Sequence, residues 1–156
     1  MSTPTAVSQP PTCGIFSRQG QLFALDSRLL REFVETRELE LTLIPRAPAC
    51  LAGVLNLRGE VLPVILPDRF LGLGDQRYER GKPVIRIRHD SLSIGIQVDS
   101  LRAVAAVPSE NLAPHPLARH SDIFAGTFVL PGFGAIDLLD LQRLIDRIVT
   151  RTTFDL

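Results

Sequence analysis

The sequence predicts an all-β fold, a barrel or sandwich built from two related halves and completed by one C-terminal helix. Short apolar runs are interrupted by Gly, Pro or Asp about every ten residues, a spacing typical of small antiparallel barrels and sandwiches. The segment GVLNLRGEVLPV at residues 53–64 recurs in outline 73 residues later. Apolar residues at helical spacing are confined to the end of the chain.

The recurrence indicates an internal duplication, because several residues keep a single offset along the chain. Two glycines, one leucine and an Asp-Ser pair are the residues that match. The pairs are Gly53 with Gly126, Leu57 with Leu130, Gly59 with Gly132, and Asp26-Ser27 with Asp99-Ser100.

Two residues of the repeated segment are not duplicated. Asn56 and Arg58 correspond to Val129 and Pro131 in the second copy. Positions shared by both copies are expected to serve the scaffold, and positions that differ are candidates for function. Arg58 is therefore the first candidate, with Asn56 beside it and Glu60 on the other side of the turn glycine.

The first half of the chain predicts a tail and a hairpin. Residues 1–12 contain three prolines and many small polar residues, so they are predicted to be a disordered tail. Residues 55–66 predict a hairpin that turns at Arg58-Gly59, because Gly59 permits the positive φ of a tight turn. Pro63 lacks an amide donor, so its strand is expected to lie at an edge or to pass a bulge there.

The second half predicts two more hairpins. In residues 83–98, Ile85 and Ile87 alternate with Arg86 and Arg88, which is the period of two of a strand with one face in the core. Residues 124–137 repeat the plan of the first hairpin, with a Pro-Gly turn.

One helix is predicted from Leu138 to about Val149, with Asp137 as its N-cap. Shorter helical turns are predicted at residues 26–30, 67–71 and 99–102. The prediction of the long helix depends on an apolar stripe at helical spacing, formed by Leu138, Leu141, Leu144, Ile145 and Ile148.

The composition excludes several classes of protein. With 45% hydrophobic residues, the 156-residue chain can bury a core. Lys and Arg total 17, as do Asp and Glu, so the basic footprint of a nucleic-acid binder is absent. The longest uncharged apolar stretches, such as residues 47–55, are too short for direct membrane insertion. We therefore expect a cytoplasmic protein, in which Cys13 and Cys50 are ordinary reduced thiols.

No catalytic constellation is recognisable in the sequence. A phosphate-binding glycine loop, a GxSxG elbow and an HExxH motif are all absent. His115, His120 and Asp122 lie in a Pro-containing stretch that is interpreted as a solvated loop. Asp26 and Asp99 are expected to repeat one structural task, such as capping a turn. The sequence therefore predicts a protein that is not an enzyme and holds no cofactor or metal.

Several segments, in the right order, resemble one family, the CheW-like chemotaxis coupling proteins. The run PACLAGVLNLRGEVLPVI at 48–65 is similar to the hallmark of that family. The further similarities are IGIQVDSL at 94–101, LFALD at 22–26 with Leu30, Glu32 and Phe33 after it, and the closing helix near 137–144.

The resemblance implies two five-stranded SH3-like barrels that share an apolar core, in one domain over residues 13–150 with a tail at 151–156. It implies an adaptor that couples the cytoplasmic tips of methyl-accepting chemoreceptors to the regulatory domain of a CheA-type histidine kinase, and it allows assembly in rings or receptor arrays. Arg58 belongs by resemblance to the receptor-facing region, as does the apolar ground between the barrels. Leu30 and Glu32 match positions near partner-binding surfaces.

Two departures from the family pattern keep an alternative open. The chain has Leu66-Pro67-Asp68 where the family usually has Asp-Leu, and the turn at 130–134 is rich in Gly and Pro. The alternative is an interaction barrel that binds only one of the two partners, in a pilus, surface-sensing or other non-flagellar pathway. A ligand-binding barrel or small-molecule hydrolase would require a concave pocket with convergent polar groups.

Overall fold

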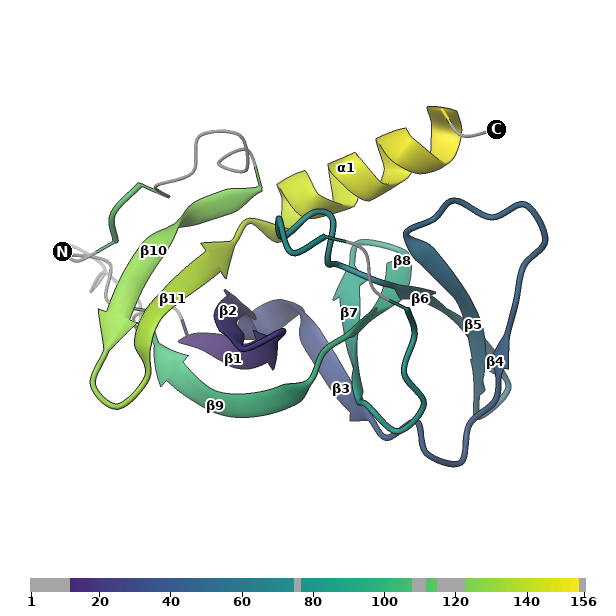
Figure 1. Ribbon diagram of the computed structural model, residues 1–156, viewed down its shortest axis with the longest axis horizontal. Coiled ribbons are helices and arrows are strands. Elements are labelled where there is room, and N and C mark those ends of the chain that lie inside the picture. Colours follow the sequence, from purple (N-terminus) through teal and green to yellow (C-terminus); the bar gives the residue numbers. More distant parts are fainter. Residues whose placement is uncertain (1–11, 75–76, 108–111, 115–122, 155–156) are drawn as a thin grey trace, which may run out of the picture.

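The computed structural model describes residues 12–74, 77–107, 112–114 and 123–154, the last four by their backbone alone. The described chain is mostly β-strand, with one C-terminal helix and one 3-10 turn (Figure 1). The predicted tail lies outside the described residues except for Thr12, as does the predicted loop with His115, His120 and Asp122. The elements are β1 (Thr12–Arg18), β2 (Gln21–Asp26), η1 (Ser27–Leu29), β3 (Leu30–Val34), β4 (Leu41–Thr42), β5 (Leu51–Leu57), β6 (Glu60–Ile65), β7 (Val84–His89), β8 (Leu92–Gln97), β9 (Ser100–Ala106), β10 (Phe124–Leu130), β11 (Gly134–Leu139) and α1 (Leu141–Phe154).

The strands form two sheets with the same plan. One sheet has the order β10-β11-β2-β1-β9, and the other has the order β3-β7-β8-β6-β5-β4. In each sheet two antiparallel hairpins are joined by a short parallel contact, between β11 and β2 or between β6 and β8. We name them barrel A and barrel B respectively. The predicted all-β fold with a C-terminal helix is confirmed.

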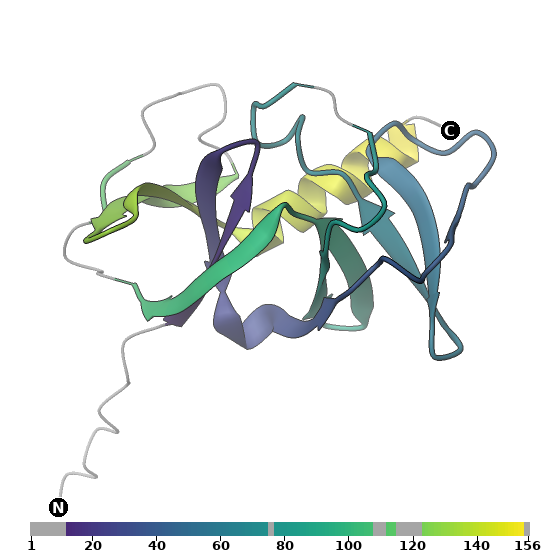
Figure 2. The same cartoon turned by 60° about the horizontal axis from the view of Figure 1, so that its bottom comes forward.

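The chain crosses between the two barrels twice. β3 follows β2 of barrel A but pairs with β7 of barrel B, and η1 marks the crossing (Figure 2). In the same way β9 follows β8 of barrel B but pairs with β1 of barrel A. Barrel B is therefore one continuous segment, β3 to β8, and barrel A is built from the strands before and after it.

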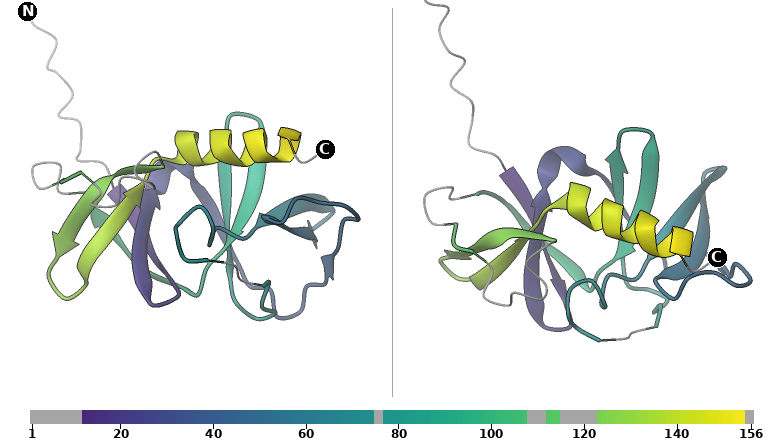
Figure 3. Two further views of the ribbon diagram at one scale, coloured as in Figure 1. Left: turned by 45° about the horizontal axis from the view of Figure 1, so that its top comes forward. Right: turned by 90° about the horizontal axis from the view of Figure 1, so that it is seen from above.

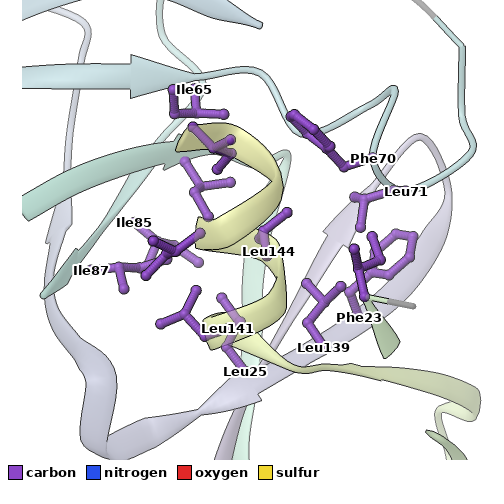
Figure 4. Close-up of a cluster of buried hydrophobic side chains, with 14 of the residues drawn as sticks. Phe23, Leu25, Ile65, Phe70, Leu71, Ile85, Ile87, Leu139, Leu141 and Leu144 are labelled. Carbon is purple, nitrogen blue, oxygen red and sulfur yellow. The ribbon is translucent and has the colours of Figure 1, made fainter. Parts of the chain in front are cut away.

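Three apolar clusters account for the core. One lies inside barrel A and includes Ile15 and Phe128, and one lies inside barrel B and includes Leu55 and Leu62. The largest lies between the barrels, where Leu144 of α1 packs among strand residues of both (Figure 4). The helix begins above the junction and extends over barrel B (Figure 3), so it covers the shared core.

The duplicated glycines have a common structural reason. Gly53 and Gly126 adopt φ values of 154° and 155°, each at a register shift in its hairpin. A Cβ atom at Gly53 would lie 2.5 Å from the carbonyl oxygen of Thr42, and one at Gly126 would lie 2.7 Å from that of Ala113. No side chain fits at either position, so both copies retain glycine.

The duplication of the Asp-Ser pair does not extend to the strand ladders. Ala24 of β2 pairs with Leu138 of β11, and Gly95 of β8 pairs with Val64 of β6 in the same way. Ala24 and Gly95 are therefore equivalent, and they lie 71 residues apart rather than 73. Asp26 therefore ends a strand, whereas Asp99 lies beyond one.

The two aspartates also perform different tasks, so the prediction of a shared one was wrong. The Asp26 carboxylate caps η1 by accepting the amide of Arg28 at 2.9 Å. The Asp99 carboxylate accepts the amide of Gln19 at 2.8 Å, across the junction. The predicted helical turn at 99–102 was wrong too, because β9 begins at Ser100.

The predicted start of the helix was also wrong. Leu138 belongs to β11, where it pairs with both Gly126 and Ala24, and the helix runs from Leu141 to Phe154. Asp140 rather than Asp137 caps it, because the Asp140 carboxylate accepts the amide of Arg143 at 3.2 Å. The strand ladder, a long-range interaction, overrides the local helical spacing of the leucines.

Candidate partner-binding site

Three of the predicted site residues meet at one end of barrel B, together with Arg86. Arg58 donates through Nη2 to both carboxylate oxygens of Glu32, at 2.8 and 2.9 Å. Arg86 donates to Glu60 at 2.5 Å and lies 3.6 Å from Glu32. We call these four residues, Glu32, Arg58, Glu60 and Arg86, the charged mouth.

The hairpin between β5 and β6 positions Arg58. Arg58 and Gly59 form a two-residue turn with φ values of 52° and 86°, the geometry of a primed hairpin turn. Asn56 closes this turn because its side-chain oxygen accepts the amide of Gly59 at 3.0 Å. The structure thus gives Asn56 a local task, which holds Arg58 at the rim of the barrel.

Leu30 lies apart from the charged mouth, although it shares β3 with Glu32. A register shift separates the two residues along the ladder with β7. Leu30 packs at the junction of the barrels, where its Cδ1 atom lies 2.4 Å from the point that a Cβ on Gly14 would occupy. Leu101 is also near this point and is 40% exposed. β3 therefore connects an apolar surface at the junction with a charged surface at the mouth.

Two positions of the charged mouth have apolar counterparts in barrel A. Arg86 of β7 pairs with Gly95 of β8 and with Glu32 of β3. At the equivalent place in barrel A, Ile15 of β1 pairs with Ala24 of β2 and with Ala103 of β9. Arg86 thus corresponds to Ile15, and Glu32 corresponds to Ala103. The strand arrangement that the two barrels share therefore does not require charged side chains at these positions.

Sequence reasoning missed Arg86. Its alternation with isoleucines placed it on the solvent side of a strand, but its side chain is only 17% exposed because that side faces the interior of barrel B. Its Nε donates to Ser93 at 3.0 Å. The signal that could have identified it was the charge of Glu60 on the neighbouring hairpin.

A second ion pair, also missed, joins the two barrels. Arg18, at the end of β1, donates to both carboxylate oxygens of Asp68 at 2.9 and 3.0 Å, and both side chains are almost fully buried. Gln19 donates to Asp68 as well, at 2.8 Å. The acidic residue that the family pattern places two positions earlier is thus replaced here by a buried carboxylate with a cationic partner.

The turn at 130–134, the second departure from the family pattern, differs from the turn at Arg58-Gly59 in length. Its loop is one residue longer than that of the first hairpin, since Leu130 pairs with Gly134 whereas Leu57 pairs with Glu60. Phe133, which the sequence left undecided between surface and interior, is partly buried against the cluster inside barrel A.

The surroundings of Cys13, Asp26 and Lys82 shift the pKa values of these three groups. Burial raises the pKa of the Cys13 thiol, which disfavours a reactive thiolate. A hydrogen bond from Arg28 lowers the pKa of Asp26. Hydrogen bonds to Glu79 and to a second carboxylate raise the pKa of Lys82.

The described residues contain no group of three His, Cys, Asp or Glu side chains placed to hold a metal ion. Among them, no helix combines the length and the apolar character that crossing a membrane requires.

The fold and the charged mouth together define a double-barrel protein with two chemically different surfaces on one strand. Comparison with known proteins agrees with this class. The family described as CheW-like domain matches residues 13–149. The fold is similar to that of the scaffolding protein TtCheW from Thermoanaerobacter tengcongensis, with a TM-score of 0.71 and 23% identity over 85% of this chain and 90% of that one.

Two curated relatives extend the comparison. The chain is 31% identical over 108 residues to Protein FrzA of Myxococcus xanthus, covering 67% of this chain and 68% of that protein. It is 26% identical over 137 residues to Chemotaxis protein CheW of Thermotoga maritima, covering 83% and 88% respectively. The chain belongs to the CheW-like domain family. It is a non-catalytic adaptor of chemotaxis signalling and not an enzyme.

Proposed function

We propose that the chain couples the cytoplasmic tip of a methyl-accepting chemoreceptor to the regulatory domain of a CheA-type histidine kinase. In this proposal the receptor contacts the charged mouth at Arg58 and the apolar junction at Leu30. The protein acts in the cytoplasm and joins receptor arrays through its partners.

The main support is the difference between the barrels. Barrel A has apolar residues at the positions that correspond to Arg86 and Glu32, yet barrel B has charged side chains at both. Arg58 has a side chain that is 67% exposed, so its pair with Glu32 contributes little to folding. Neither the strand arrangement nor the stability of the fold requires the exposed charge of Arg58, so we attribute this charge to contact with a partner.

The apolar junction supports the same proposal. Leu30 is partly buried, Phe33 is 38% exposed and Leu101 is 40% exposed. Large apolar side chains beside an ordered ion pair resemble the mixture of an apolar centre and a polar rim that protein interfaces use.

The substitution Arg58→Glu tests the proposal. It places a third carboxylate at the mouth and should weaken binding of a receptor cytoplasmic fragment by about tenfold or more, because a desolvated Arg contact is worth about 2 kcal/mol. Isothermal titration against the receptor fragment and against the kinase regulatory domain measures both affinities. Arg77→Glu, at an exposed arginine outside the charged mouth, is the matched control.

Two results would contradict the proposal. One is unchanged receptor binding by the Arg58→Glu protein while its circular dichroism remains native. The other is failure of the wild-type chain to bind both partners in one complex, which size-exclusion chromatography of the three-component mixture would reveal.

The second candidate is an adaptor that binds only one of these partners, in a pilus, surface-sensing or other non-flagellar pathway. Two observations favour it: the similarity to FrzA, a relative not named CheW, and the Arg18–Asp68 pair in place of the usual acidic residue. Separate pull-downs with each partner discriminate the candidates, because only a coupler retains both.

A further inference from the structure

A small cleft lies beside Arg86, where β6 separates from β8. The parallel ladder joins these strands only at Val64 and Ile65, so the start of β6 diverges from its neighbour. The space left between them has a volume of about 310 Å³, which suits one or two side chains rather than a whole peptide. Its lining residues are Leu57, Glu60, Val61, Leu62, Arg86, Arg88, Ser91 and Ser93.

The two arginines of the cleft differ in their partners. Arg86 is held by Glu60, Glu32 and Ser93. Arg88 lies two residues further along the same face of β7 and is exposed, and within the described part of the chain its guanidinium has no hydrogen bond or ion pair. The cleft therefore contains one cation held in place and one that is available.

The charges around the cleft do not balance. Among the side chains that line it, Arg86 and Arg88 contribute two positive charges, against one negative charge from Glu60. One further carboxylate would neutralise the group, and a guanidinium is suited to bind a carboxylate through two hydrogen bonds. Barrel A has no such excess at the matching positions of its first strand, where Arg88 corresponds to Ser17 and Arg86 to Ile15.

The cleft also has an apolar side. Leu57 and Leu62 are 6% and 2% exposed and form its floor, while Val61 is 67% exposed at the rim. An apolar side chain next to the incoming carboxylate would cover Val61 and exclude water from the ion pair.

We infer that this cleft receives a single Asp or Glu side chain, flanked by a small apolar residue, from the partner that contacts Arg58. The inference rests on the proposed function, in which that partner is the receptor tip. Arg88 binds the carboxylate, and the Ser91 hydroxyl is placed to donate a hydrogen bond to it. Arg86 stays paired with Glu60 and keeps the cleft open.

The test compares Arg88→Glu with Arg77→Glu in the full chain. Arg77 is an exposed arginine outside the cleft and without an ion pair in the described residues, so it controls for net charge. Titration against the receptor fragment should show at least about a tenfold loss of affinity for Arg88→Glu and less than about a twofold change for Arg77→Glu. Affinity for the kinase regulatory domain should stay within about twofold for both variants.

Charge exchange completes the test. Single Asp→Arg and Glu→Arg substitutions in the receptor fragment are each titrated against Arg88→Glu, and one of them should restore at least half of the lost binding free energy. Thermal unfolding of Arg88→Glu at the wild-type temperature confirms that its fold is intact.

Each contrary result has a distinct meaning. Equal behaviour of Arg88→Glu and Arg77→Glu would overturn the inference, as would a loss that no receptor substitution rescues, or a loss confined to the kinase domain. If Arg58→Glu still weakens receptor binding in these cases, the proposed function stands. If the wild-type chain binds neither partner, both fail together.

Discussion

The two barrels differ in chemistry where β6 and β11 diverge from their parallel partners. In barrel B this end carries Arg86, which has three polar partners. In barrel A the equivalent Ile15 is fully buried. The comparison separates the requirements of the fold from those of function within one molecule, because both ends have the same backbone plan.

The largest expected effect comes from exchanging these two residues. Ile15→Arg would bury a charge without a partner and should destabilise the protein by about 4 kcal/mol or more, or prevent folding. Arg86→Ile should cost only about 1 kcal/mol, because Glu60 is 66% exposed and stays solvated. Urea unfolding of both variants measures the difference. Similar losses for the two would mean that the mouths are not structurally equivalent.

The next effect concerns the pair that joins the barrels. Arg18→Met would leave the carboxylate of Asp68, which is 1% exposed, without its cation, and should cost about 3–5 kcal/mol. The double variant Arg18→Met/Asp68→Leu should recover a large part of this loss, because no buried charge remains. Chemical denaturation of the single and double variants provides the measurement. A double variant as unstable as the single one would show that the pair contributes through packing instead.

A smaller and symmetric effect is expected at the duplicated glycines. Gly53→Ala and Gly126→Ala should each cost about 2–3 kcal/mol, because the new methyl group would contact a backbone carbonyl that cannot easily move. Gly132→Ala, at φ 84° with no heavy atom within 4 Å of the new Cβ, should cost about 1 kcal/mol. Thermal unfolding ranks the three. Clearly unequal losses at Gly53 and Gly126 would contradict the shared scaffold.

The smallest effects concern the turn of barrel B. Asn56→Ala removes the hydrogen bond to the amide of Gly59 and should cost about 1 kcal/mol. Arg58→Ala removes a largely exposed ion pair and should change stability by less than about 0.5 kcal/mol. Differential scanning calorimetry of both proteins would show whether Arg58 can be changed without harm to the fold, and a loss above about 2 kcal/mol for Arg58→Ala would assign it a structural task instead.

The parts predicted correctly from the sequence depend on local chemistry. The hairpin at 83–98 and the turn at Arg58-Gly59 were predicted because alternation and glycine spacing are visible in a short window. Glu32, Arg58 and Glu60 were predicted as candidates from the duplication and the family resemblance, and the structure brings them together. Whether they bind a partner stays a prediction.

The parts that were missed depend on contacts between distant residues. The helix was placed three residues early because Leu138 continues the apolar spacing, and only its pairing with β2 and β10 shows that it is a strand residue. Arg18 and Asp68 are 50 residues apart, and nothing local to either one indicates a buried partner. Asp26 and Asp99 matched in sequence, but the ladders that relate the two halves have a different offset.

The insertion of barrel B between β2 and β9 of barrel A has a consequence for how the protein is made. β1 and β2 leave the ribosome first, but barrel A also needs β9, β10 and β11, which are synthesised last. The barrel that is begun first is thus completed second, after the strands of barrel B have all emerged. Pairing Cys13 with Ala105 closes a loop that contains all of barrel B, and long loops of this kind slow folding. Barrel A is therefore expected to close only after synthesis of β11, when α1 can cover the core that both barrels share.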